Sequence, residues 1–165
     1  MKKKAKLAFA QLQEELQVIS QHDLAFYQGG DGIDGYCLFY AMSYLSNGSH
    51  NTDYYLNSYG QVYGYSGLVP SGNDGYISGA DIANVSSFVA GHFTSSSLNP
   101  SGGIQAALAS GWRVLADMSI SSNTTHAIII TGYTSSGYTY YDPQNNVTGV
   151  VQSGNLAGNV LMGIH

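Results

Sequence analysis

Cysteine occurs only once in this sequence of 165 residues, at Cys37, so the chain cannot form an internal disulfide. Tryptophan also occurs once, proline three times, and charged residues make up only 9% of the chain. No apolar run reaches the ~18 residues of a membrane span, so we predict that no segment crosses a membrane. Because no disulfide can form, the folded state must be stabilised by packing. The length predicts one domain with one core.

Positive charge is almost absent beyond Gly30, where Arg113 is the single lysine or arginine and stands against seven aspartates. The net charge of this region is about −6, and such a surface repels phosphate backbones. We therefore exclude nucleic acid as a partner. Polarity comes instead from Ser, Thr, Asn, Gly and 14 tyrosines, which are typical either of an extracellular contact surface or of half-buried strand positions.

The first thirty residues have the composition of an export leader. Lysines crowd the amino terminus, and Leu12, Leu16 and Ile19 recur at the spacing of an amphipathic helix. Polar residues interrupt the segment throughout, so it lacks the continuous apolar core of a general secretory signal.

The residues before Gly30 resemble a double-glycine leader. Apolar or acidic residues occupy the fourth, seventh, eighth and twelfth places counted back from Gly30, namely Tyr27, Leu24, Asp23 and Ile19. The resemblance implies docking on the leader-peptidase domain of an exporter and cleavage after Gly29-Gly30, whose lack of side chains suits a narrow cleft. We expect a leader over residues 1–30, a cytoplasmic precursor and a secreted domain over residues 31–165. The alternative is an ordinary amphipathic helix followed by a turn.

Helical patterns lie in the first part of the expected domain. Residues 35–45 (GYCLFYAMSYL) are apolar on nearly all sides, which predicts a buried central helix with Cys37 in its first turn. Residues 57–75 are rich in Gly and Tyr without a period and predict a long surface loop. Two further helices are expected at residues 78–90, capped by Ser78 with Gly91 past the end, and 101–110, stopped by Gly111.

After Gly111 the apolar pattern changes to alternation or to continuous β-branched runs, which predict strands. The expected strands are residues 112–118, 126–133, 138–142, 147–152 and 159–163. Their succession favours an antiparallel meander. We therefore predict an α+β fold with the helices gathered on one side of the sheet.

Three residues stand in the order of a Cys-His-Asp hydrolase: Cys37 at a helix start, His126 at the head of an apolar strand and Asp142 at the end of the next strand. The nucleophile of such an enzyme is a thiolate, which both a helix amino terminus and a neighbouring imidazolium stabilise. A carboxylate that accepts the other ring proton fixes the tautomer and direction of the imidazole. Each residue alone also has a structural interpretation, as a core cysteine, a strand histidine or a turn-starting aspartate.

The strand spacing makes a specific demand on this arrangement. If residues 134–137 form a hairpin loop, Tyr133 faces Tyr138 and Asp142 lies opposite Ile129. In that register the side chains of Asp142 and His126 point to opposite faces of the sheet. A bulge or a shift of one residue is therefore required to bring them together.

The segments GYCLFYAMSYL, THAIIITGY and YTYYDPQNN resemble papain-like cysteine peptidases, especially the bacterial branch related to bacteriocin-leader peptidases. The similarity covers roughly residues 28–146, and ALASGWRVLADM before the histidine strand also looks like family members. The resemblance implies a papain-like fold in two parts, with the cysteine on a central helix and the histidine and aspartate on the sheet. Together with the expected leader, it implies a secreted cysteine peptidase (thiol protease).

One position departs from the family pattern. The family usually carries a glutamine six residues before the cysteine, and its amide helps stabilise the tetrahedral oxyanion. Here that place is Asp31, and the nearest glutamine, Gln28, lies nine residues before Cys37 on the leader side of the expected cut. Gln28 is the remaining candidate for the oxyanion role. After cleavage, the new α-ammonium of Asp31 is an alternative source of positive charge.

The sequence predicts neither a metal site nor a cofactor, because His22, His50, His92 and His165 show no ligand spacing with one another or with Cys37. We expect a hydrolase that acts on a peptide or protein substrate. Two alternatives stay open: a catalytically inactive papain-like effector that binds its target or acts as a toxin outside the cell, and a cell-wall amidase or endopeptidase.

Overall fold

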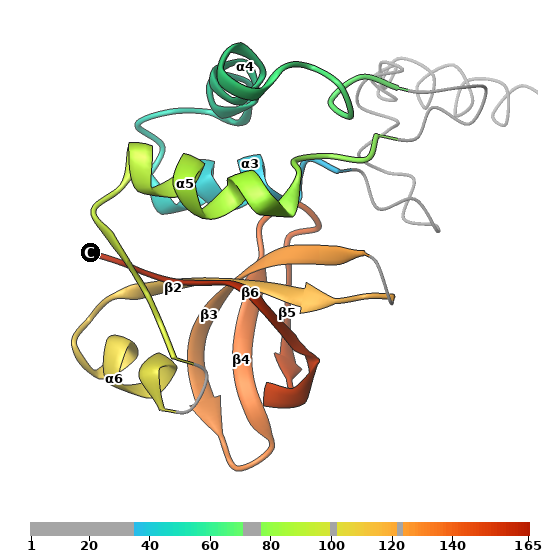
Figure 1. The fold of residues 1–165 in the computed structure, drawn as a ribbon. Helices are drawn as coiled ribbons and strands as arrows, with labels where there is room; N and C mark the ends of the chain where they lie inside the picture. Colours follow the sequence, from blue (N-terminus) through green and yellow to red (C-terminus); the bar gives the residue numbers. More distant parts are fainter. Residues whose placement is uncertain (1–34, 71–76, 100–101, 122–123) are drawn as a thin grey trace, which may run out of the picture. The chain divides into compact units, whose positions relative to one another are not determined.

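The computed structural model describes residues 35–70, 77–99, 102–121 and 124–165, which belong to one unit, Ile33–His165. Its helices are α3 (Cys37–Leu45), α4 (Thr52–Tyr63), α5 (Ile82–His92) and α6 (Gly103–Ala109) (Figure 1). Its strands are β1 (Ser95–Ser97), β2 (Arg113–Ser119), β3 (Thr125–Thr134), β4 (Gly137–Asp142), β5 (Val147–Val151) and β6 (Leu156–Ile164). The predicted α+β class is confirmed. No helix within these ranges is long and apolar enough to cross a membrane.

The strands form one antiparallel sheet in the order β1-β6-β2-β3-β4-β5. Strands β2 to β5 make the predicted meander, and the β3–β4 hairpin places Tyr133 opposite Tyr138, as expected. Strand β6 departs from the meander because it returns across the sheet to pair with β2, where Met162 lies opposite Leu115. Strand β1 then pairs with β6 at the edge. The sequence pattern does not predict β1, because three consecutive serines carry no apolar alternation.

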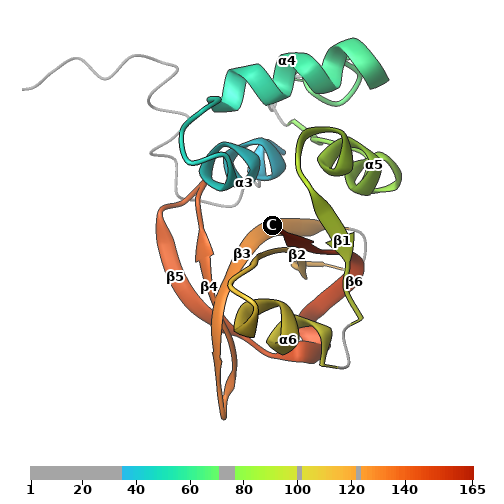
Figure 2. The same cartoon turned by 90° about the vertical axis from the view of Figure 1, so that its left-hand side faces the viewer.

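Helices cover both faces of the sheet, so the prediction that they gather on one side is wrong. Phe39 of α3 and Val89 of α5 share a core cluster with Leu115 and Ile129. On the other face, Ile104 of α6 packs in a second cluster that includes Val114, Ala116, Ile128 and Ile130. The physical reason is that β2 and β3 carry continuous apolar runs, which are buried on both sides and need cover on both. Figure 2 shows α3 and α5 on one side of the strands and α6 on the other.

The predicted loop over residues 57–75 is wrong in its first part, because α4 continues to Tyr63. Asn51 caps this helix by accepting a hydrogen bond from the backbone N–H of Tyr54. Tyr55 and Tyr59 lie four residues apart on one helix face and are 1% and 2% exposed. Aromatic side chains therefore supply the buried stripe that aliphatic residues usually supply.

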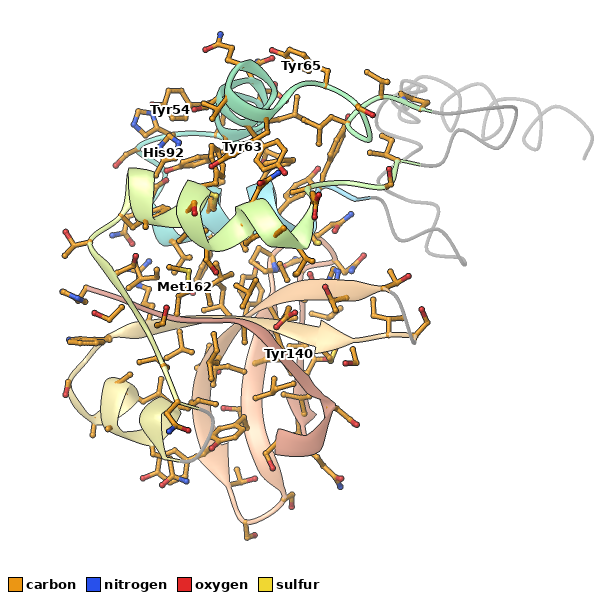
Figure 3. All side chains as sticks on the ribbon, viewed as in Figure 1. Tyr54, Tyr63, Tyr65, His92, Tyr140 and Met162 are labelled. Atoms are coloured by element: carbon orange, nitrogen blue, oxygen red, sulfur yellow. The ribbon has the colours of Figure 1, made fainter. Side chains whose placement is uncertain are left out.

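The aromatic side chains of this region divide between the surface and the core. In Figure 3, Tyr54, Tyr63 and Tyr65 lie around the α4 layer, and His92 lies at the facing end of α5. Met162 lies between α5 and the sheet, within the core cluster of α3 and α5. Tyr54, Tyr63 and Tyr65 are exposed, whereas Tyr55 and Tyr59 are buried on a helix and not half-buried on strands.

Two helix boundaries differ from expectation. Helix α5 begins after Asp81, whose carboxylate accepts from the Ala83 N–H, and it continues through Gly91. Ser78 is therefore not its cap. Helix α6 begins at Gly103 and ends before Gly111, which has the positive φ of +77° that favours glycine beyond a helix end.

Candidate active site

Cys37 is the first residue of α3, as predicted, and its thiol is free and half-buried. The helix is held by the apolar side chains that follow Cys37 within it. All of them are buried: Leu38, Phe39, Ala41, Met42 and Leu45. The amino terminus of a helix carries a partial positive charge and unpaired N–H groups. Cys37 therefore lies at the end of α3 that carries this partial charge.

Close backbone packing fixes the chain that leads into α3. The Gly35 N–H donates to the carbonyl oxygen of Ile77 at 3.0 Å, and the hydroxyl of Tyr36 donates to that of Leu68 at 2.9 Å. A Cβ atom at Gly35 would overlap the backbone of Gly79, which itself has a φ of +85°. Two glycines thus meet where side chains would not fit, and this contact sets the position of Cys37.

His126 and Asp142 form a buried pair on neighbouring strands. Nε2 of His126 lies 2.7 Å from Oδ2 of Asp142, and the two residues are 5% and 4% exposed. At this length, and with the histidine protonated, the contact is a charge-assisted hydrogen bond. Because Asp142 occupies Nε2, the other ring nitrogen, Nδ1, is the one left for Cys37, which lies close enough to His126 to raise the pKa of the imidazole.

The bulge that the strand spacing required is present. Between Ile130 and Gly132 the pairing of β3 with β4 shifts by one residue. Tyr141, and not Asp142, therefore lies opposite Ile129. Because side chains alternate along a strand, a shift of one residue reverses the face to which each points. The shift therefore brings Asp142 to the same face as His126, and the two side chains meet there.

The turn after β4 orients the carboxylate of Asp142. Its Oδ1 accepts hydrogen bonds from the N–H groups of Gln144 and Asn145 at 3.0 and 3.2 Å. The side-chain amide of Asn145 donates to Oδ2 at 2.7 Å, beside the contact with His126. Sequence reasoning missed Asn145, although the run Asp-Pro-Gln-Asn is a turn in which an aspartate accepts from the following backbone.

The pair is charged at neutral pH. Burial lowers the pKa of His126, but its interactions with Asp142 and Cys37 outweigh burial and raise the pKa to about 9. Burial raises the pKa of Asp142, but hydrogen bonds from His126 and Asn145 outweigh it, and the net shift is downward. At neutral pH His126 is therefore an imidazolium held by the Asp142 carboxylate, with Cys37 among its neighbours.

A cavity of about 60 Å³ lies against Cys37. Its walls come from α3, the start of α5, and strands β2, β3 and β6, and they include Thr125 and Ala127 on either side of His126 in the chain. Asp117 of β2 also lines it and is 4% exposed. No sequence pattern singled out Asp117, because its role depends on strands that meet only in the folded chain.

Several predicted positions lie outside the described residues. These are the oxyanion candidate Gln28, the cleavage pair Gly29 and Gly30, and Asp31. Among the residues that the structure does describe, no three His, Cys, Asp or Glu side chains are grouped so as to hold a metal ion. Comparisons with models of protein families, with curated proteins and with solved structures give no match.

Proposed function

We propose that residues 31–165 form a secreted papain-like cysteine peptidase or a related amide hydrolase, which acts on a peptide or protein substrate. Cys37 is the nucleophile, His126 the general base and acid, and Asp142 the group that orients His126. The observation that carries the proposal is the buried imidazole held at 2.7 Å by Asp142 with Cys37 as its other partner. A cysteine that opens a helix packed against an antiparallel sheet bearing the histidine and aspartate agrees with the papain-like resemblance.

The chemistry follows from these positions. The Cys37 thiolate attacks the carbonyl carbon of the substrate amide, and the carbonyl electrons move onto its oxygen. When the tetrahedral intermediate collapses, the C–N bond breaks and the His126 imidazolium gives its proton to the leaving amine. A water molecule then loses a proton to neutral His126 and attacks the thioester, which releases the carboxylic acid and restores the thiolate–imidazolium pair.

Labelling of Cys37 with a thiol-directed peptide electrophile tests the proposal directly. Because the chain has one cysteine, an increase in intact mass reports Cys37 alone. We expect labelling at pH 7 to be at least about tenfold faster than in the urea-unfolded protein, because the folded site stabilises the thiolate.

The matched control is His126→Ala, which keeps the cysteine and its helix but removes the imidazolium. It should slow labelling toward the unfolded rate. Labelling of the folded wild type at or below the unfolded rate would contradict a catalytic thiolate and favour the inactive effector.

We also propose that residues 1–30 are a double-glycine leader. Co-expression with an exporter that carries a leader-peptidase domain should release a protein whose measured intact mass begins at Asp31. Replacement of Gly29 and Gly30 by valine should block release, because the side chains would not enter the narrow cleft. A released product that still carries Met1, or one cut at another bond, would refute the leader.

The inactive extracellular effector is the second candidate, and the observation that favours it is Asp31 at the place of the oxyanion glutamine. A carboxylate there repels the developing oxyanion. Exposed tyrosines such as Tyr54 and Tyr133, 42% and 56% exposed, would suit a binding surface. A cell-wall amidase or endopeptidase would use the same triad, and digestion of peptidoglycan separates it from a protein peptidase.

A further inference from the structure

Asp117 is a buried carboxylate beside the proposed nucleophile. It lies in the middle of β2 opposite Ala127, the residue after His126, and on the same face of the sheet as Leu115. It is 4% exposed and lines the cavity that Cys37 also lines. Buried carboxylates are rare unless they are paired, bind a ligand or are protonated, so the surroundings of each oxygen of Asp117 matter.

One oxygen of Asp117 has a structural role. Oδ1 accepts a hydrogen bond from the Val160 N–H at 3.1 Å. Between Ala116 and Met118, at Asp117, the pairing of β2 with β6 changes register. The carboxylate thus accepts from the Val160 N–H in place of a backbone carbonyl, which the irregular pairing of β2 with β6 does not supply. An asparagine would make the same bond, so this contact does not explain a carboxylate at this position.

The other oxygen, Oδ2, is buried and has no hydrogen-bond partner among the described residues. No described cation compensates its charge. Arg113 donates instead to the carbonyl oxygens of Tyr44 and Leu45 at 3.3 and 3.2 Å, and His126 is held by Asp142. Burial accordingly raises the pKa of Asp117. A ligand that brings a cation to Oδ2 would remove the cost of this uncompensated group.

The rest of the cavity limits what that ligand is. Most of its wall is apolar, with Leu38, Ile82, Val85, Leu115, Ala127 and Val160 among the lining residues. Ser78, Thr124 and Thr125 are the lining residues that carry hydroxyl groups, and Cys37 carries the thiol. A volume of about 60 Å³, at about 10–15 Å³ for each water-sized group, holds roughly four to six heavy atoms. The side chain of lysine has five heavy atoms beyond Cα, and that of arginine has seven.

We propose that this cavity binds a lysine side chain of the substrate next to the bond that Cys37 attacks, with the ammonium at the carboxylate of Asp117. The four methylene groups lie against the apolar walls, and nearby hydroxyls accept the remaining ammonium protons. This proposal rests on the proposed hydrolase function, because that function explains why a substrate side chain would bind beside Cys37. It names the substrate class as peptides with lysine at one position near the scissile bond.

Binding without turnover tests the cavity separately from the enzyme activity. The full-length Cys37→Ala protein is titrated, with detection by two-dimensional NMR, with Nα-acetyl-lysine N-methylamide and with its norleucine counterpart, which lacks the ammonium. We expect the lysine compound to bind at least about tenfold more tightly, and the corresponding arginine compound to bind more weakly than lysine because it exceeds the cavity.

Two variants in the same background localise the effect. Asp117→Asn keeps the acceptor for the Val160 N–H and removes the charge, so it should abolish the preference for lysine over norleucine. Asp53→Asn removes the same charge from an exposed position on α4 and should leave the preference unchanged.

The outcomes are distinguishable even if Asp117→Asn does not fold, because the comparison of the lysine and norleucine compounds on the Cys37→Ala protein is a test by itself. A lysine compound that binds no more tightly than norleucine, or does not bind, overturns the lysine site and leaves the hydrolase proposal intact. A lysine preference in a protein whose Cys37 does not label supports the cavity and contradicts the hydrolase.

Discussion

Replacing Cys37 with alanine is expected to abolish hydrolysis, with a fall in kcat/KM on the order of 10⁵ or to below detection, because no other group forms the covalent intermediate. The substitution should leave the fold intact, since Cys37 is half-buried at a helix start and alanine is a good helix former. The measurement is the cleavage rate of a lysine-containing peptide library by the processed protein, with the circular dichroism of both proteins compared.

The control for this change is Cys37→Ser, which keeps the size of the side chain and a hydroxyl. It should also lose activity, because a serine hydroxyl beside His126 is a far weaker nucleophile than a thiolate. If Cys37→Ala retains the wild-type rate in a preparation free of other peptidases, the nucleophile assignment is wrong.

The second large effect is expected from His126→Ala, which should lower kcat/KM by on the order of 10³ because it removes the proton donor for the leaving amine. Asp142→Ala should cost less, about 10²-fold, since the carboxylate acts through the imidazole. The same library and folding controls apply to both variants.

The pH profile distinguishes orientation from a general loss of structure. The acid form of His126 is needed to protonate the leaving group, and its pKa is about 9, so the wild-type rate should fall as the pH rises through about 9. Asp142 raises this pKa through its hydrogen bond and charge. In Asp142→Ala the pKa of His126 should therefore fall, and the alkaline decline should begin at a lower pH.

Asp53→Ala is the matched control for this shift, because it removes the same charge from the exposed start of α4. Its alkaline decline should coincide with that of the wild type. An unchanged alkaline decline in Asp142→Ala, with activity reduced, would show that the carboxylate supports the fold and not the protonation state of His126.

Asp31→Gln is informative if the processed wild type cleaves nothing. The variant places an amide six residues before Cys37, at the position where papain-like peptidases usually carry the oxyanion donor. Activity that appears in this variant would identify Asp31 as the cause of an inactive wild type, and would support the effector interpretation of the natural sequence.

The parts of the fold that were predicted correctly depend on neighbours along the chain. The helix that starts at Cys37 follows from an uninterrupted apolar run, and the β3–β4 hairpin follows from the spacing of its apolar residues and its turn. The need for a bulge near Asp142 also followed from alternation alone, because a strand has a strict period of two. In each case the signal lies within one element or within one hairpin, and even His126 and Asp142 are only 16 residues apart.

The errors arose where a choice depended on distant segments. Tyr55 and Tyr59 form a helix stripe because a core is present to bury them, whereas the Gly and Tyr content of residues 57–75 alone favoured a loop. The position of α6 across the sheet from α3 and α5 depends on β2 and β3 needing cover on both faces. Neither outcome can be predicted from the residues of the helix alone.

The candidate site divides in the same way. The sequence by itself predicted Cys37, His126 and Asp142 as the candidate site residues, because a helix start, a strand head and a turn are local features. Only the tertiary structure decided that Asn145 holds the carboxylate of Asp142 and that Asp117 faces the cavity beside Cys37. The position of Asp117 depends on β6, which lies about 40 residues from β2 in the chain and pairs with it irregularly. Val160 of β6 donates a hydrogen bond to one oxygen of Asp117. The other oxygen has no partner among the described residues.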